Sequence, residues 1–213
     1  GNQNIDDFAS LGLWSGGGNY DGSPGITHNQ LSNPDLKWET TRQWNIGFEA
    51  SLLKNKIDIE LNYYNKYTYD LLLDIPIPAK TGFSSTIQNV GEMSNKGVEL
   101  EITSRNVDNK IWSWTTSFNL SHNKNLVEKL PISFSQYSRD WVRLEEGYPM
   151  YSFWLYKQIG VDPQTGNVIF EGAKDGKLPV SARQVMGNAM PDFYGGLSNT
   201  VTWNGFDLSF LFT

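Results

Sequence analysis

Apolar and polar residues alternate along much of the chain. Between Thr41 and Leu52, every second position from Trp44 onward is apolar, and the intervening positions are polar or glycine. Because side chains of a β-strand point to opposite faces at every second residue, this pattern predicts an amphipathic strand. The same alternation recurs near 56–69, 96–106, 111–122, 197–203 and 206–212. No segment keeps helical spacing over three turns, so the pattern predicts an all-β protein.

The length of the alternating runs narrows the fold class. The first four runs are about twice as long as the five or six residues usual in soluble strands. Strands of about ten residues with one apolar and one polar face are typical of a transmembrane β-barrel wall, whose apolar face meets lipid. A soluble sandwich shows the same alternation with its apolar face inward. A secreted all-β carbohydrate-binding module is therefore the alternative.

The connections between the predicted strands alternate between short and long. Tight turns are expected at 53–55, at 108–110 and at Asn204-Gly205, a favoured hairpin dipeptide, whereas 71–95 and 123–191 are long links. In an antiparallel up-and-down meander, all tight turns then lie at one end, as in outer-membrane barrels with long extracellular loops. The expected order is an irregular extracellular loop at 1–40, four barrel strands within 41–122, a long extracellular loop at 123–191 with a small hairpin near 158–171, and a last hairpin at 192–213.

Composition excludes several function classes. The 213 residues carry 17 Lys and Arg against 23 Asp and Glu, a net charge of -6, which argues against a nucleic-acid backbone binder. The absence of cysteine excludes disulfides and thiolate metal sites. No apolar run approaches the ~20 residues of a membrane-spanning helix, and residues 1–10 lack the features of a signal peptide. Alternation explains why the chain is aromatic-rich yet polar on average.

Acidic side chains recur on the predicted polar face. Paired carboxylates could serve a glycosidase. Their regular spacing is explained more simply by an acidic, water-facing lumen wall, so we expect no enzyme. The only histidines, His28 and His122, lie in unrelated segments, so neither a metal site nor a cofactor is expected. The acidic residues are Glu49, Asp58, Glu60, Glu99 and Glu101.

Aromatic and arginine side chains on the long-loop side are the candidate ligand-binding residues. Aromatic rings stack well on sugar rings and peptide side chains, although packing of the loops is the alternative explanation. Aromatic residues near the strand ends are instead expected to form interfacial girdles. The candidate binding residues are Trp14, Tyr20, Arg139, Trp141, Arg143, Tyr148 and Trp154. The expected girdle residues are Tyr63, Tyr67, Tyr69, Trp112, Trp114 and Trp203.

An ordered set of motifs from about Leu31 to Thr213 resembles the SusC/RagA-type TonB-dependent outer-membrane transporters. The motifs include Asn33-Pro34-Asp35-Leu36-Lys37-Trp38-Glu39, Gln88-Asn89-Val90-Gly91, Asn95-Lys96-Gly97-Val98-Glu99, Gly160-Val161-Asp162-Pro163 and Pro191-Asp192-Phe193-Tyr194-Gly195-Gly196. The resemblance covers most of the chain, and its specificity lies in the order of the motifs.

The resemblance implies a plugged barrel that imports oligosaccharides or peptides across a Bacteroidota-type cell outer membrane. It implies uptake driven by the TonB complex, a SusD-like surface lipoprotein as a lid, and contact with outer-membrane lipid. Plugged transporters have roughly 22 strands. The sequence predicts about six strands, which cannot close a barrel. We therefore expect the C-terminal barrel portion of a larger protein, whose plug and TonB-contacting segment lie outside this sequence.

Overall fold

The computed structural model describes residues 8–135, 140–174 and 176–213. These residues form β-strands, joined by turns and two short 3-10 helices, and the prediction of an all-β protein is confirmed. The chain divides into two compact units, which are described separately. Unit 1 comprises 1–42, 67–93 and 128–131, and unit 2 comprises 43–66, 94–127 and 132–213. Among the described residues, no helix is long and apolar enough to span a membrane.

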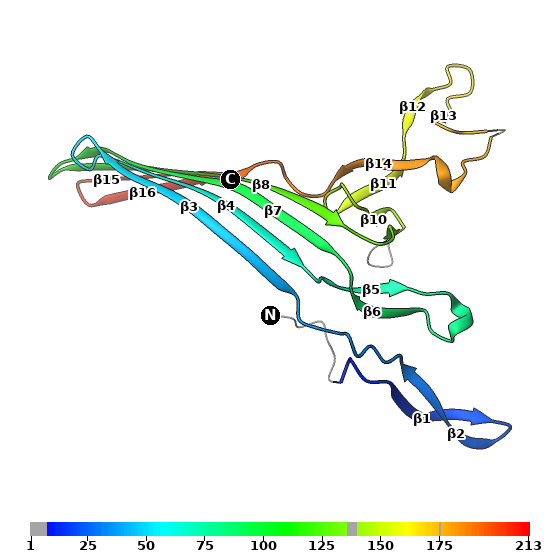
Figure 1. Cartoon of the computed structure of the whole chain (residues 1–213). Coiled ribbons are helices and arrows are strands. Elements are labelled where there is room, and N and C mark those ends of the chain that lie inside the picture. The colour runs from blue at the N-terminus through cyan, green and yellow to red at the C-terminus, as the bar shows by residue number, and fades with distance from the viewer. Residues whose placement is uncertain (1–7, 136–139, 175) are drawn as a thin grey trace. The chain divides into compact units, whose positions relative to one another are not determined.

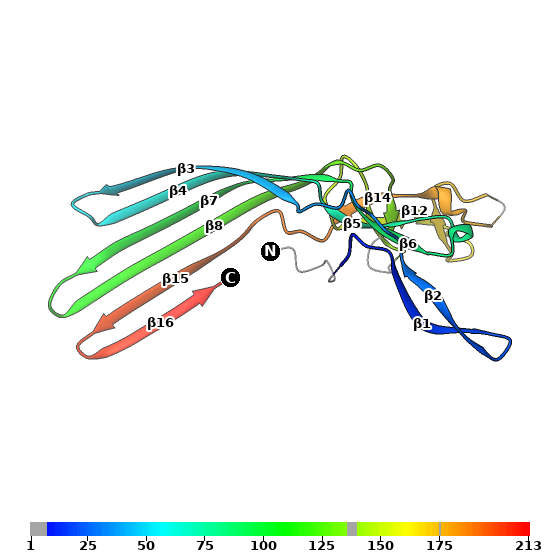
Figure 2. The ribbon, with the colours of Figure 1, turned by 60° about the horizontal axis from the view of Figure 1, so that its bottom comes forward.

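The principal sheet has six strands, most of whose length lies in unit 2. Its order is β16-β15-β8-β7-β4-β3, and consecutive strands run in opposite directions as an up-and-down meander (Figures 1 and 2). The pairing of β8 with β15 continues without a slip from Tyr194↔Ser121 to Trp203↔Trp112. The strands are β3 Thr40–Leu52, β4 Ile57–Tyr69, β7 Glu92–Asp108, β8 Trp112–Lys129, β15 Tyr194–Trp203 and β16 Phe206–Phe212.

The three tight turns of this sheet form where the sequence predicts them. Residues 53–55 all have positive φ between the ends of β3 and β4. Asn109 accepts backbone N–H bonds from Ile111 and Trp112 at 3.0 and 2.9 Å, which closes the turn from β7 to β8. Asn204 and Gly205 have φ of 46° and 85° between paired Trp203 and Phe206, as a two-residue primed turn requires.

The apolar face of the six-stranded sheet is exposed. Ile46 and Phe48 on β3, and Leu208 and Phe212 on β16, are all exposed. Among the described residues, the buried hydrophobic side chains are Ile75, Val127, Leu130, Val142 and Leu144, and none of them belongs to this alternating face. A sandwich would bury this face against a second sheet. An exposed apolar surface of this extent marks a face that contacts another protein surface or a membrane.

Three stretches contain more strand than the sequence predicts. The opening stretch, expected to be irregular, forms a hairpin of β1 Leu13–Tyr20 and β2 Ser23–Gln30. The link 71–95 forms a second hairpin of β5 Leu72–Pro76 and β6 Ser85–Asn89, with a 3-10 turn at Ala79–Thr81. β8 continues to Lys129 rather than ending near 122. Glycine and proline in the first two stretches lie in turns, in a bulge and at a strand end, which hides the strands from a pattern search.

The segment after β8 contains a second, four-stranded sheet in unit 2. Its order is β14-β11-β10-β9, and Val142 and Leu144 are buried in it. A small hairpin of β12 Gln158–Val161 and β13 Val168–Phe170 lies where the sequence indicates one. The remaining elements are β9 Phe134–Ser135, β10 Val142–Leu144, β11 Ser152–Tyr156, the 3-10 turn Val180–Ala182 and β14 Arg183–Asn188.

Candidate functional site

The four-stranded sheet brings together three of the candidate binding residues, Trp141, Arg143 and Trp154. Arg143 pairs across the sheet with Ser152, which places it diagonally opposite Trp154 on one face. Its guanidinium carbon lies 4.1 Å from the Trp154 ring centroid, and its Nε lies 2.9 Å from a Glu145 carboxylate oxygen. The Arg143 and Glu145 side chains are each only 27% exposed. Arg143 is therefore held within the sheet by a cation–π contact and an ion pair.

Trp141 and Tyr148 present more accessible rings in the same unit, each with 41% of the residue exposed. The Trp141 carbonyl accepts the backbone N–H of Trp154 at 2.9 Å, and its ring centroid lies 6.1 Å from that of Phe153. The Tyr148 carbonyl accepts the backbone N–H of Val127 at 3.0 Å. Backbone bonds thus fix both residues, and part of each side chain stays exposed.

Trp14 belongs to the β1–β2 hairpin of unit 1. Its indole stacks on the His28 ring, with centroids 4.4 Å apart and planes inclined by 15°. Phe83 meets the His28 ring edge-on at 5.2 Å, so two rings support the indole from one side. Of the remaining candidates, Arg139 and the side chain of Tyr20 lie outside the described residues.

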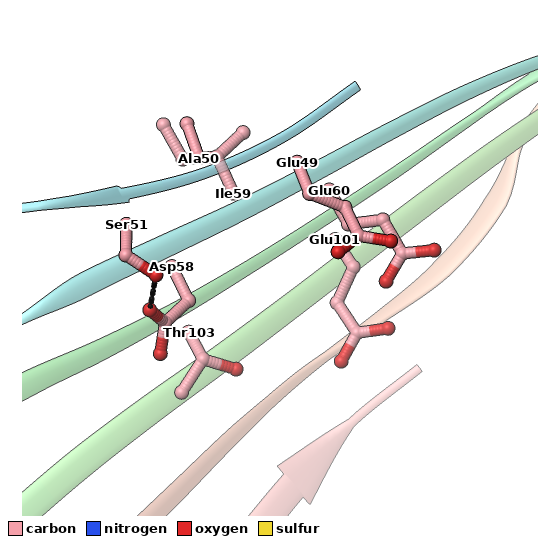
Figure 3. A pocket seen from close by; sticks show the side chains of 8 residues that line it. All are labelled: Glu49, Ala50, Ser51, Asp58, Ile59, Glu60, Glu101 and Thr103. Atoms are coloured by element: carbon pink, nitrogen blue, oxygen red, sulfur yellow. Dashed lines mark hydrogen bonds between the residues drawn. The ribbon is translucent and has the colours of Figure 1, made fainter. Parts of the chain in front are cut away.

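Four of the five carboxylates named for the polar face, all except Glu99, line an open hollow of about 250 Å³ on β3, β4 and β7. Figure 3 shows Glu49, Glu60 and Glu101 projecting to the same side. Asp58, by contrast, accepts a bond from Ser51 at 2.7 Å and one from Arg105 at 2.6 Å. Among the described residues, no group of three or more potential ligands is arranged to hold a metal ion. The arrangement is that of an exposed, acidic wall.

Aromatic pairs lie at both ends of the apolar face of β8 and β15. At the tight-turn end, the rings of Trp112 and Trp203 are 5.6 Å apart. At the other end, the rings of His122 and Phe193 are 5.0 Å apart, and His122 Nδ1 lies 2.5 Å from the Asp192 carbonyl oxygen. The second pair is not among the aromatic residues expected from the sequence, although His122 on β8 has the parity of Trp112, and Phe193, just before β15, has the parity of Trp203.

The spacing of these two pairs matches the apolar band of a membrane barrel. Ten residue steps separate Trp112 from His122. They correspond to ~33 Å along a strand, and a tilt of ~40° reduces this to ~25 Å, the usual height of the band. Figure 2 shows β8 as a continuous strand over this distance.

A short chain of hydrogen bonds crosses the apolar face between the two pairs. Asn199, 8% exposed, accepts from Trp114 Nε1 at 2.9 Å and from the Thr116 hydroxyl at 2.7 Å. Asn106 donates to Thr116 at 2.8 Å, and Ser104 donates to Asn106 at 2.9 Å. These polar groups bond to one another, which lowers the cost of placing them on an apolar surface.

Long amphipathic strands, an exposed apolar face between aromatic pairs, and a polar, acidic opposite face define a segment of β-barrel wall. The family model described as "TonB dependent receptor-like, beta-barrel" matches residues 3–210. The chain therefore belongs to the β-barrel family of TonB-dependent receptors, and the resemblance to SusC/RagA-type proteins is confirmed.

Similar proteins carry receptor and transporter names. TonB-dependent receptor P39 of Formosa agariphila is 32% identical over the whole chain, which covers 25% of that receptor. TonB-dependent receptor SusC of Bacteroides thetaiotaomicron is 29% identical, with 99% of this chain and 23% of SusC covered. The structure of the RagAB peptide transporter matches with a TM-score of 0.85 at 28% identity, covering 97% of this chain and 24% of the matched chain. The chain thus spans about a quarter of the length of these relatives.

Proposed function

We propose that this chain is part of a TonB-dependent transporter of the cell outer membrane that imports oligosaccharides or peptides. The observation that carries the proposal is the exposed apolar face of the six-stranded sheet, bounded by Trp112–Trp203 and His122–Phe193. In this function the apolar face contacts lipid and the acidic face lines a water-filled lumen. The chain supplies barrel wall and loops, while the plug and the TonB-contacting segment belong to other parts of the protein.

The position of the tight turns supports an orientation for this wall. The three tight turns join β3 to β4, β7 to β8 and β15 to β16, at one end of the meander. The longer segments with β5–β6 and the four-stranded sheet join β4 to β7 and β8 to β15 at the other end, and the segment with β1–β2 precedes β3. In outer-membrane barrels the short turns face the periplasm and the long loops face outward. The exposed rings of Trp14, Trp141 and Tyr148 then belong to external loops, where a ligand or a lid arrives first.

The relatives support a transport function and a lid partner. RagAB is named a peptide transporter, and another of its structures is described as the "open-open" state of a peptide importer. The resemblance to SusC/RagA-type transporters implies a SusD-like surface lipoprotein as a lid, and we propose that partner for this chain. The glycosidase alternative has weaker support, because Asp58 is already bound to Ser51 and Arg105 and Glu60 accepts a bond from Asn62.

Uptake by intact cells tests the proposal. The full-length protein containing this chain is expressed with its neighbouring lipoprotein, and cells receive fluorescently labelled neutral oligosaccharides and labelled peptides. We expect uptake of one class that requires the full-length gene and is abolished when TonB is deleted. Uptake that persists without TonB, or an outer-membrane fraction that lacks the protein, would contradict the proposal. Release of free sugar by the purified protein would favour the glycosidase.

A further inference from the structure

We propose that the β1–β2 hairpin holds a binding subsite for an uncharged sugar ring, formed by Trp14 and the glycine bulge at Gly16–Gly17. The inference rests on the proposed transport function and names the substrate class that this loop recognises. It depends on three observations on the hairpin: a supported, exposed indole, two bulge glycines whose φ angles do not require glycine, and the absence of lysine and arginine from residues 13–30.

The indole of Trp14 is both rigid and open. Trp14 pairs directly with His28 across the hairpin, so the two side chains lie on the same face. His28 covers one side of the indole and Phe83 backs His28, yet 62% of Trp14 remains exposed. A ring fixed from behind loses little conformational entropy when a ligand stacks on its free surface.

The glycines beside Trp14 are not explained by the fold. The register shifts between Ser15 and Gly18, so that Gly16 and Gly17 form a bulge opposite Ile26. Neither glycine has a positive φ, and a Cβ atom added to either would meet nothing within 4 Å. Gly18 differs, because its Cβ would lie 3.0 Å from the Thr27 side chain. Glycine in a strand often marks a bulge or a place where a ligand or another backbone approaches closely, and this bulge does not itself need glycine because neither φ is positive.

The bulge also supplies hydrogen-bonding groups beside the indole. An antiparallel bulge leaves one residue without its ladder bonds, so backbone N–H and C=O groups at Gly16–Gly17 are available to a ligand. A sugar ring presents C–H groups on its face and hydroxyls at its rim. An indole flanked by bare backbone amides matches both features.

The charge of the hairpin favours an uncharged ligand. From Leu13 to Gln30 the only formally charged residue is Asp21, which lies in the turn between the strands. No lysine or arginine is present in this range to neutralise a sulfate, a uronate or a peptide carboxylate. A neutral saccharide therefore fits better than a charged glycan or a free peptide terminus.

Binding to an array of neutral oligosaccharides tests this subsite. The full-length transporter, purified in detergent and fluorescently labelled, is applied to gluco-, xylo-, manno- and galacto-oligosaccharides and to a peptide array. We expect binding to at least one neutral oligosaccharide, weakened about tenfold by Trp14→Ala, which corresponds to ~1.4 kcal/mol of lost stacking. Trp38→Ala removes another exposed tryptophan of unit 1, with 66% exposure, and should leave the affinity unchanged.

The double substitution Gly16→Val and Gly17→Val separates ligand contact from folding. A Cβ at either position meets no protein atom within 4 Å, so the hairpin should fold normally, with unchanged tryptophan fluorescence before ligand is added. We expect the loss of sugar affinity to be at least as large as for Trp14→Ala. Unchanged sugar binding in both variants would overturn the subsite.

Other outcomes also decide the question. Absence of binding to every neutral oligosaccharide, or Trp14-dependent binding of peptides instead, overturns the sugar class. Trp14→Ala could also retain less of the partner lipoprotein while binding sugar normally. That result would show that the Trp14 ring docks the lid, and it would overturn the sugar subsite. If the wild-type protein imports nothing in cells, the transport function fails. If it imports normally with either variant, the subsite alone fails.

Discussion

Individual side chains on the apolar face of β8 and β15 show how polar groups are accommodated there. Asn199 is the shared acceptor for Trp114 and Thr116, and its exposure of 8% is low for a residue on this face. A buried donor that loses its acceptor costs about 1–3 kcal/mol, because its desolvation is no longer compensated. The chain from Ser104 to Asn199 is therefore a stabilising network whose members depend on one another.

Replacing Asn199 should reveal this dependence. We expect Asn199→Ala to lower the free energy of unfolding of the full-length protein in lipid vesicles by about 1–3 kcal/mol, because the Trp114 and Thr116 donors lose their acceptor. Urea titration followed by tryptophan fluorescence measures the change. Thr200→Ala, on the opposite face and exposed, is the matched control and should cost below about 0.5 kcal/mol. Equal losses would show that the network contributes nothing.

Gly97 illustrates a glycine required by packing. A Cβ at this position would collide with the ring of Tyr64, whose hydroxyl donates to Asn123 at 2.9 Å. We expect Gly97→Ala to displace Tyr64 and to destabilise the protein by about 1–3 kcal/mol, as overpacking does elsewhere. Gly160→Ala is the control, because its Cβ meets nothing within 4 Å. Thermal unfolding of the two variants makes the comparison, and a Gly97→Ala protein as stable as Gly160→Ala would refute the packing role.

The sequence located these residues with unequal success. The sequence indicates Gly97 only as part of a family motif. Its packing role is not predictable, because Gly97 and Tyr64 lie on different strands. Arg143 was expected among ligand-binding residues, but its partners Glu145 and Trp154 come together only when β10 pairs with β11. The sequence predicts Trp14 as a ligand-binding residue only because it is aromatic and lies on the long-loop side. The His28 and Phe83 rings that support it are distant in the chain and could not be assigned to it beforehand.

At the scale of elements, strands with regular alternation were predictable and strands held by distant contacts were not. β3 and β4 appear close to their predicted limits because alternation continues to their ends. The extension of β8 beyond 122 is mostly polar, and it is held by Asn125, which donates to Asn95 at 2.9 Å and accepts from Met150 N–H at 2.8 Å. Bonds of this kind leave no periodic signal in the sequence.

The β12–β13 hairpin is anchored at its base by charge. The Glu171 carboxylate pairs with Lys157 at 3.0 Å and accepts a hydrogen bond from the Gln184 amide at 3.0 Å. These two contacts lower the pKa of the Glu171 carboxyl below its ordinary value. Because the pKa of the Glu171 carboxyl is lower in the folded than in the unfolded state, the ionised carboxyl stabilises the folded hairpin. This stabilisation is fully present above the unfolded pKa of about 4.3 and is lost as pH falls through the folded pKa. The hairpin should therefore loosen in acid.

Hydrogen exchange at 158–170 measures this loosening. We expect backbone exchange of the hairpin, corrected for its intrinsic pH dependence, to rise as pH falls below about 4, while β8 stays protected. Glu171→Gln, which cannot ionise, should show the looser hairpin already at pH 7 and a smaller further change in acid. The remaining change comes from the Asp162 carboxyl in the turn, because hydrogen bonds from Gln164 and Thr165 also lower its pKa. Glu146→Gln serves as a control carboxylate outside this contact. A hairpin whose protection is the same at pH 7 and pH 3 in the wild-type protein would exclude the anchoring role.

At the scale of the whole molecule, the alternating lengths of the connections predicted the up-and-down order of the sheet. Alternation alone left a sandwich open, because both folds have one apolar face. The structure discriminates between them through exposure: the buried hydrophobic residues Val142 and Leu144 lie in the four-stranded sheet, and the apolar face of the six-stranded sheet stays uncovered. In the proposed outer-membrane location, lipid covers that face, and the expected orientation of the wall follows from its turns.

Cysteine labelling on intact cells tests the orientation. The chain has no cysteine, so single substitutions introduce one reactive site within it, with any cysteine elsewhere in the full-length protein replaced. Gln164→Cys lies in the exposed turn between β12 and β13, and Lys110→Cys lies in the exposed tight turn between β7 and β8. Because the long segments should face outward, a membrane-impermeant maleimide should label Gln164→Cys and not Lys110→Cys. Both sites should react after the outer membrane is permeabilised, which controls for their accessibility. Labelling of Lys110→Cys alone on intact cells would reverse the orientation, and equal labelling of both would contradict a membrane-spanning wall.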